Sequence, residues 1–254
     1  MKNLKKLYIV FIICSLSFGL SFEKLDEAKD LLKKGVDNWD ISSMEKARDL
    51  FISLILTEKE NPYIYYYISL ADYRVATFFL TKEKKKAERY LQEGLDYLDK
   101  AIKINPAIGE LYALYGSLLG IKIGLKPEEA MFIGMEIDRY FSMALEKDPE
   151  NPRVNLLKGI DLLYTPEQFG GGAKNALKYL ERSILLFEKE RVEDALKPSW
   201  GKEEAYTYLG MAWQKMDEKE KAYEALKKAL EINPSFGYAR IQLNQLEKSK
   251  KEPK

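Results

Sequence analysis

Apolar residues recur along this chain at the spacing of amphipathic α-helices, and several of these stretches end at an Asn-Pro or Asp-Pro pair. The three clearest end at Pro106, Pro149 and Pro234. Because the residue before a proline avoids the helical conformation, each pair predicts a helix end. Together with Pro62 and Pro198, these prolines follow one another at intervals of roughly 36 to 49 residues, which is typical of a helical repeat. The pattern therefore predicts an all-α chain of repeated helix pairs.

The last unit shows the pattern most clearly, with large and small apolar residues alternating over two helices. Its positions are Tyr206, Leu209, Gly210 and Trp213 on the first helix, then Ala222, Leu226 and Ala229 on the second, with Pro234 as terminator. The small residues allow the two helices to approach closely, and the large ones fill the space between neighbouring pairs.

This arrangement resembles the tetratricopeptide repeat, in which an aromatic, Leu-Gly and a second aromatic mark the first helix. The second helix of that repeat carries Ala, a large apolar residue, Ala and a terminal Pro. The resemblance extends over residues 23–246 and implies a right-handed α-solenoid of about five helix-turn-helix units. The domain boundaries expected from it are 22–246, followed by a charged, disordered tail over 247–254.

The third unit is longer than the last, and its extra residues fall between Ile121 and Ile137. This stretch contains Gly124, Met131, Phe132, Gly134 and Met135, small and adaptable residues. We expect a helix that lengthens the unit, and the alternative is a surface that binds a partner or forms an oligomer.

In tetratricopeptide proteins the first helices of successive units line a concave ligand-binding surface, so the resemblance nominates the residues near the small positions of these helices. They are Tyr65, Asp72, Ser117, Arg153, Leu156, Ile160, Thr207, Met211 and Gln214. The middle of this set is mainly apolar, which favours an apolar peptide, a lipid-like ligand or the helix of another protein over a clamp for carboxylates.

A glycine-rich segment, residues 164–176, interrupts the fourth unit between its helices. Phe169 is followed there by Gly170, Gly171 and Gly172. Such glycines can leave backbone N–H groups free for a carboxylate or phosphate at a helix start. The favoured interpretation is a structural loop closing the turn over Phe169, and the alternative is a loop that contacts a ligand or partner.

The phrase Pro166-x-x-Phe169-Gly170-Gly171 also resembles the repeat-containing T component of tripartite ATP-independent periplasmic (TRAP) transporters. In that family a similar turn is often followed by an acidic residue, where this chain has Gly172. The resemblance implies a periplasmic solute-binding protein as partner and an apolar small molecule as ligand.

Residues 1–21 begin with lysines, continue with an apolar run from Leu7 to Leu20 and end in small residues, Gly19 and Ser21. This order predicts a cleavable signal peptide and a periplasmic or otherwise extracytoplasmic protein. A membrane anchor formed by residues 7–20 is the alternative, although the run spans only about 21 Å against a hydrocarbon core of about 30 Å. A lipid-modified Cys14 is a further alternative.

The composition excludes many kinds of catalytic and metal-binding site, because the 254 residues include no histidine and one cysteine. Most zinc sites, catalytic triads and Cys-His pairs are thereby excluded, and we expect no enzyme activity, cofactor or metal. The 41 basic and 40 acidic residues leave a net charge of +1 and indicate no nucleic-acid partner.

These observations predict a non-catalytic extracytoplasmic scaffold that binds a protein or peptide, with a homo-oligomer as a further expectation. The alternative is a ligand-binding accessory subunit of a periplasmic, TRAP-like transport system.

Overall fold

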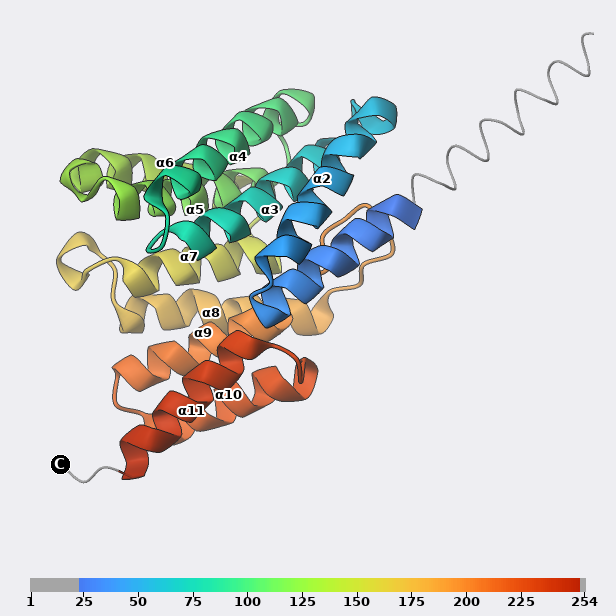
Figure 1. The fold of residues 1–254 in the computed structure, drawn as a ribbon. Helices are drawn as coiled ribbons and strands as arrows, with labels where there is room; N and C mark the ends of the chain where they lie inside the picture. The colour runs from blue at the N-terminus through green and yellow to red at the C-terminus, as the bar shows by residue number, and fades with distance from the viewer. Residues whose placement is uncertain (1–22, 252–254) are drawn as a thin grey trace, which may run out of the picture.

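The computed structural model describes residues 23–251, and all regular secondary structure in this part is helical (Figure 1). The helices pack pairwise in chain order: residues 23–38 with α2 (Ile41–Glu58), α3 (Pro62–Phe79) with α4 (Lys84–Ile104), α5 (Gly109–Leu125) with α6 (Ala130–Lys147), α7 (Pro152–Tyr164) with α8 (Ala173–Lys189), and α9 (Lys202–Lys215) with α10 (Lys219–Ile232). A last helix, α11 (Gly237–Lys251), covers the fifth pair. The predicted all-α solenoid of about five helix pairs is confirmed.

Prolines occur at two different positions relative to these helices, after the C-cap and in the first turn. Asn105, Asp148 and Asn233 are the C-cap residues of α4, α6 and α10, and each precedes a proline, as predicted. Pro62 instead occupies the first turn of α3, where its missing N–H costs nothing, and the side chain of Asn61 caps that helix by accepting from the Tyr63 N–H. Pro62 therefore starts the first, inner helix of a pair, whereas Pro106, Pro149 and Pro234 follow the second, outer helix of a pair.

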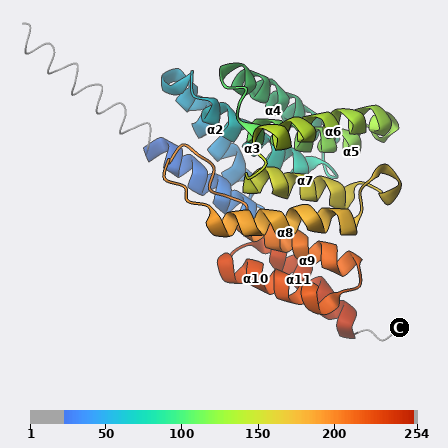
Figure 2. The same ribbon diagram turned by 180° about the vertical axis from the view of Figure 1, so that it is seen from behind.

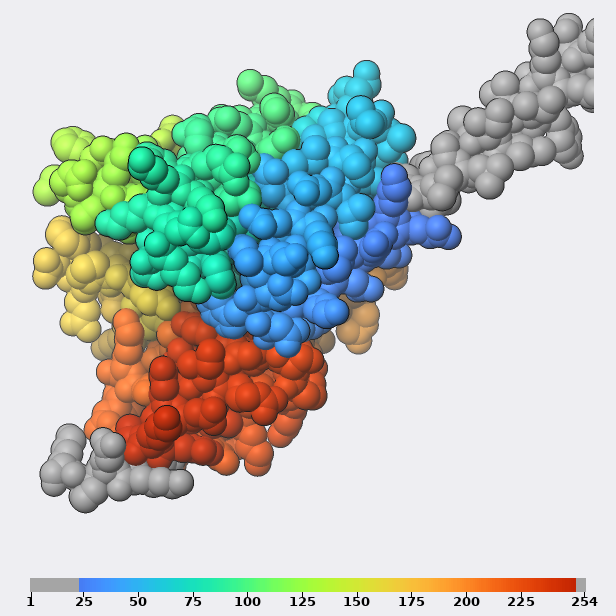
Figure 3. Space-filling model, in the orientation of Figure 1, coloured from blue at the N-terminus to red at the C-terminus, as the bar shows by residue number. Residues whose placement is uncertain are grey.

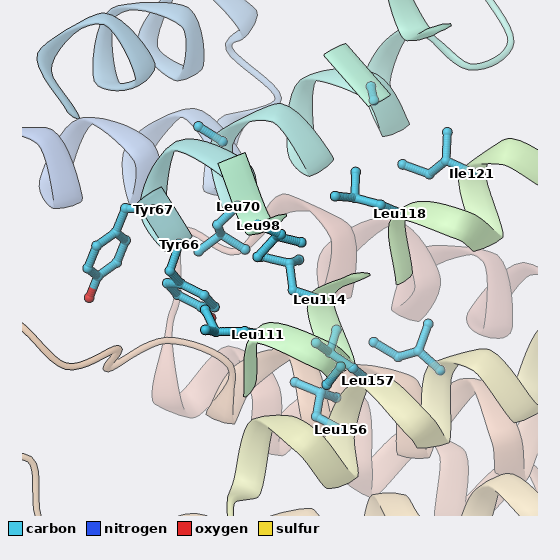
Figure 4. Close-up of a cluster of buried hydrophobic side chains, with 14 of the residues drawn as sticks. Tyr66, Tyr67, Leu70, Leu98, Leu111, Leu114, Leu118, Ile121, Leu156 and Leu157 are labelled. Carbon is cyan, nitrogen blue, oxygen red and sulfur yellow. The ribbon is translucent and has the colours of Figure 1, made fainter. Parts of the chain in front are cut away.

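Close approach between paired helices depends on the small residues of the repeat. A Cβ added to Gly210 in α9 would lie 2.7 Å from Leu226 Cγ in α10, and one added to Gly116 in α5 would lie 3.0 Å from the Phe141 ring in α6. Leucines from α3, α4, α5 and α7 then fill the space between successive pairs (Figure 4). The core is thus continuous from one pair to the next.

The longer third unit is built as expected, by longer helices. Helices α5 and α6 have 17 and 18 residues, whereas α9 and α10 have 14 each. The 3-10 turn Pro127–Glu129 joins α5 to α6. The extra residues therefore project from one side of the molecule, at the left of Figure 1 and the right of Figure 2.

The first and last helices of the described chain meet, so the solenoid closes on itself (Figure 3). The side-chain amide of Asn233 donates to Asp37 Oδ1 at 2.9 Å, and the rings of Trp39 and Tyr238 lie edge to face at 6.0 Å. Residues 190–201 form a long non-helical segment between α8 and α9, and the Tyr67 hydroxyl donates to the Lys197 carbonyl within it. This segment reaches the face of α3 that an open superhelix would leave to solvent.

The sequence predicted a disordered tail at the C-terminal end and a signal peptide at the N-terminal end. Helix α11 continues to Lys251, so residues 247–251 are helical and the expected disordered tail is wrong for them. The predicted signal peptide or anchor, residues 1–21, and residues 252–254 lie outside the described residues. Between residues 23 and 251 no helix is long and apolar enough to cross a membrane.

Candidate functional site

The inner helices α3, α5, α7 and α9 bury most of the residues expected to line an open concave groove. The buried members of that set are Tyr65, Asp72, Arg153, Leu156, Ile160 and Thr207, whereas Ser117, Met211 and Gln214 are half-buried. Closure of the solenoid and the segment 190–201 cover part of this face, whereas Tyr65 packs against Tyr97 of α4 and Asp72 pairs with Arg48 of α2. In this structure the six buried residues form part of the core, and their contact with a ligand stays a prediction.

Arg153 is the centre of a buried network across the inner face. Its guanidinium donates to both carboxylate oxygens of Glu190, at 2.6 and 3.0 Å, and its Nε lies 3.6 Å from Glu110 Oε1. Glu110 also accepts from the Tyr66 hydroxyl at 2.7 Å, and the Trp200 indole N–H donates to that same hydroxyl. Burial raises the pKa of Glu110, and the charge of Arg153 opposes this change. The network ties α5, α7 and α3 to the segment 190–201.

A second buried ion pair joins Arg74 of α3 to Glu204 of α9 at 2.6 Å. The Arg74 guanidinium lies 4.9 Å from the centre of the Trp200 ring, in cation–π contact. Burial raises the pKa of Glu204, and Arg74 counters it. The inner face is therefore charged and internally paired, in contrast to the mainly apolar surface expected from the sequence.

Asp72 pairs with Arg48 of α2, which also contacts Glu93 of α4. The Asp72 side chain is wholly buried, and its Oδ2 has no hydrogen-bond partner. This burial raises the pKa of Asp72 from 3.8 to about 7, against the opposing charge of Arg48. A carboxyl in this position is protonated more readily in the folded chain than in the unfolded chain.

The raised pKa of Asp72 determines how the stability of the fold depends on pH. Because the folded state holds the Asp72 proton more tightly, this residue's contribution to the free energy of unfolding falls as the pH rises from about 4 to about 7. We expect wild type to lose stability relative to Asp72→Asn over this range, measured by chemical denaturation at several pH values. Asp49→Asn, at an exposed position of α2, is the control. A constant difference between wild type and Asp72→Asn would contradict the assignment.

The glycine-rich loop satisfies its own backbone. The N–H of Gly170 donates to Glu167 O, that of Gly171 to Pro166 O, and that of Gly172 to Leu162 O and Thr165 O. The Asn175 side chain donates to the carbonyls of Gly170 and Gly171. These three N–H groups are thus engaged within the loop, which favours the structural interpretation over an anion cradle.

Phe169 does not lie beneath this loop. Its side chain is 64% exposed at the end of the 3-10 turn Glu167–Phe169, so the expectation that the loop closes over it is wrong. Gly170, by contrast, has φ of +82°, the left-handed conformation expected for a glycine there.

An open groove lies along α9 and α10, on the helix pair with the clearest repeat pattern. Its lining consists of Tyr206, Leu209, Trp213, Glu220, Lys221, Glu224, Ala225 and Lys228, and its volume is about 440 Å³. The Lys221 ammonium lies 4.5 Å from the centre of the Trp213 ring. We call this feature the α9–α10 groove.

The sequence pattern assigned Tyr206 and Trp213 to packing and so missed the groove. Both side chains remain half-buried, because their outer surfaces face it. Both occupy repeat positions that usually pack, so no local signal distinguishes them. Within the described residues, no cluster of three or more His, Cys, Asp or Glu is arranged to hold a metal ion.

Comparison with known protein families identifies the repeat in the fifth helix pair. Residues 203–236 match the tetratricopeptide repeat family, which confirms the predicted repeat in the fifth pair. No curated protein matches the sequence.

The solved structures that share the fold include the following three. The HusA haemophore from Porphyromonas gingivalis is 24% identical with a TM-score of 0.64, over 76% of this chain and 91% of that one. The human IFIT1 dimer with m7Gppp-AAAA is 17% identical with a TM-score of 0.64, over 89% of this chain and 45% of that one. TTC0263, a thermophilic tetratricopeptide protein of Thermus thermophilus, is 16% identical with a TM-score of 0.55, over 86% of this chain and 98% of that one.

At these identities the similarity concerns the fold alone. The fold is that of tetratricopeptide proteins, a helical solenoid. This chain spans less than half the length of IFIT1.

Proposed function

We propose that this protein is a non-catalytic, extracytoplasmic scaffold whose α9–α10 groove binds a segment of a partner protein. The groove is the observation that carries the proposal, because it is an apolar depression open to solvent on the pair that matches the tetratricopeptide repeat. The buried inner face supports the same choice, since its nominated contacts are occupied by internal packing.

The lining of the groove indicates the chemistry of the partner. Tyr206, Leu209 and Trp213 supply a floor of aromatic and aliphatic surface along α9, the composition of interaction hot spots. Lys221 and Lys228 on α10 alternate with acidic residues along the rim. A short amphipathic helix fits this arrangement, with its apolar face on the floor and charges of both signs along its edges.

Site-specific photo-crosslinking in the protein's own cells tests the proposal. A benzoylphenylalanine at position 224, in the groove, is expected to give a discrete adduct with one polypeptide, whereas the same group at position 227 gives none. Lys227 is exposed on the same helix but does not line the groove, which makes it the matched control. Equal adducts at both positions, or none at 224, would show that the groove is not the binding site.

Trp213→Ala is expected to reduce the yield of that adduct at least tenfold, because a buried indole at the centre of an interface typically contributes about 2 kcal/mol or more. Leu56→Ala, which removes an apolar side chain 88% exposed on α2, should leave the yield unchanged. Lys221→Glu reverses a rim charge without changing the core, so its effect separates binding from folding. An undiminished adduct in both groove variants would contradict the proposal.

The second candidate function is that of a ligand-binding subunit of a periplasmic, TRAP-like transport system. It is favoured by the groove volume of about 440 Å³, since pockets for small molecules span about 300–1,000 Å³. Two lysines beside an aromatic floor would suit a flat aromatic ligand with acidic groups, and HusA, which shares the fold, is a haemophore.

Native mass spectrometry of protein purified from its own cells separates the two candidates. A retained polypeptide supports the scaffold, and a retained molecule of small mass supports the ligand-binding subunit. Titration with haemin, followed by quenching of tryptophan fluorescence, examines the second candidate directly. Quenching that is equal in wild type and in Lys221→Glu/Lys228→Glu would argue against binding in the groove.

A further inference from the structure

The start of α6 carries an apolar face that no part of the described chain covers. Met131, Phe132 and Met135 are 71%, 77% and 70% exposed, although all three lie within two turns of one helix. At helical spacing they share one side, which we call the Met-Phe face. Gly134 lies at its margin, and a Cβ added there would have no atom within 4 Å. Side chains of this size are seldom left together in water without a partner.

The position of this face in the molecule is equally distinctive. The start of α6 lies on the projecting third unit, on the opposite side of the molecule from the first described helix, residues 23–38, in both Figure 1 and Figure 2. Figure 3 shows the same edge in light green at the left, above the yellow atoms of the fourth pair. The α9–α10 groove is formed by other helices, so the two surfaces are independent.

Charges along α6 are arranged to complement a second copy of the same helix. Acidic residues Glu128 and Glu129, in the 3-10 turn before α6, precede the Met-Phe face, and Arg139 follows it about two turns after Phe132 on the same side. Arg139 also lies 3.6 Å from Glu136 of its own helix, and both side chains are exposed, so its guanidinium remains open to a second carboxylate. If two α6 helices pack antiparallel with their two-fold axis between Phe132 and Met135, Glu128 of each copy lies opposite Arg139 of the other. Phe132 then meets Met135 of the second copy, a favourable contact between sulfur and an aromatic ring.

We propose that the Met-Phe face is the contact of a two-fold symmetric homodimer of this protein, formed by antiparallel packing of α6 on α6. A two-fold interface uses the same patch on both copies, so the patch must be complementary to itself. The order acid, apolar, base along one helix meets that requirement. An anionic membrane is disfavoured, because Glu128, Glu129 and Glu136 outnumber Arg139 around the face.

Analytical ultracentrifugation tests the proposal on protein purified from cells that express the whole chain. One helix face gives an interface at the small end of the stable range, so the measurement extends to about 200 µM. We expect a dimer that forms with rising concentration and is weakened at least tenfold by Phe132→Asp. Leu56→Asp is the matched control, because Leu56 is 88% exposed on α2 and should not affect association.

Charge exchange tests the antiparallel arrangement. Glu128→Arg and Arg139→Glu should each weaken the dimer, because each places like charges opposite one another, and the double variant should restore it. A monomer at every concentration, an equal effect of Leu56→Asp, or two single variants that leave the dimer intact would overturn the proposal. Flotation of a monomeric protein with phosphatidylcholine vesicles would assign the face to lipid and overturn it as well.

Discussion

Arg153→Met is expected to lower the free energy of unfolding by about 3–5 kcal/mol, the typical cost of removing one partner from a buried ion pair. The Arg153 side chain is 2% exposed and contacts Glu190 and Glu110. Glu110 is itself 3% exposed, so the substitution leaves its carboxylate in the core with only the hydrogen bonds from Tyr66 and Asn151. Chemical denaturation monitored by circular dichroism measures the loss.

Two further variants make this expectation specific. Arg182→Met removes an exposed arginine of α8 whose guanidinium lies 3.5 Å from the Pro149 carbonyl oxygen, so it should change stability by less than about 0.5 kcal/mol. Adding Glu110→Gln to Arg153→Met should recover part of the loss, because the uncompensated charge is then removed. A loss below about 1 kcal/mol in Arg153→Met would show that solvent reaches this network.

The helix pairs could be predicted from the sequence because the signals that define them are local. Small residues such as Gly210 and Ala222 fix where two helices touch, and Asn-Pro or Asp-Pro pairs fix where the outer helices end. Each of these rules depends on neighbours within one repeat. The five pairs and the longer third unit followed from them.

The closed inner face could not be predicted in this way. Closure depends on small rotations added over five pairs, and it brings Asp37 next to Asn233 at the far end of the solenoid. The segment 190–201 has no repeat pattern, so the place of Trp200 between Arg74 and Arg153 has no local signal. Rules that describe one repeat contain no information on closure, so they led us to expect an open groove.

Isolated charges in apolar helices were a usable signal for the buried network. Asp72 and Arg74 are the only charged residues of α3, and Glu110 is the only acid of α5. A charge on an otherwise apolar helix needs a partner nearby, either within the protein or on a ligand. The resemblance to the tetratricopeptide repeat nominated Asp72 as a ligand contact, whereas its partner in the structure, Arg48, lies on a different helix pair.

Gly171→Ala is expected to destabilise the fold by about 3 kcal/mol, the upper end of the usual cost of overpacking. A Cβ at Gly171 would lie 2.0 Å from the carbonyl oxygen of Thr165 and 2.5 Å from its carbonyl carbon. Both are backbone atoms at the end of α7, so no side-chain rotation relieves the overlap, and the turn between α7 and α8 must open. Thermal unfolding and chemical denaturation measure the effect.

Gly170→Ala is the matched control, because a side chain at this adjacent position is disfavoured by the backbone conformation and not by overlap with other atoms. Its Cβ would meet no atom within 4 Å, and only its φ of +82° disfavours a side chain, at about 1–2 kcal/mol. If the loop is structural, the two variants should differ in stability and bind partner equally once folded. Equal stability of the two variants would contradict the packing argument. A loss of partner binding by folded Gly170→Ala would instead make the loop part of the binding surface, next to the exposed ring of Phe169.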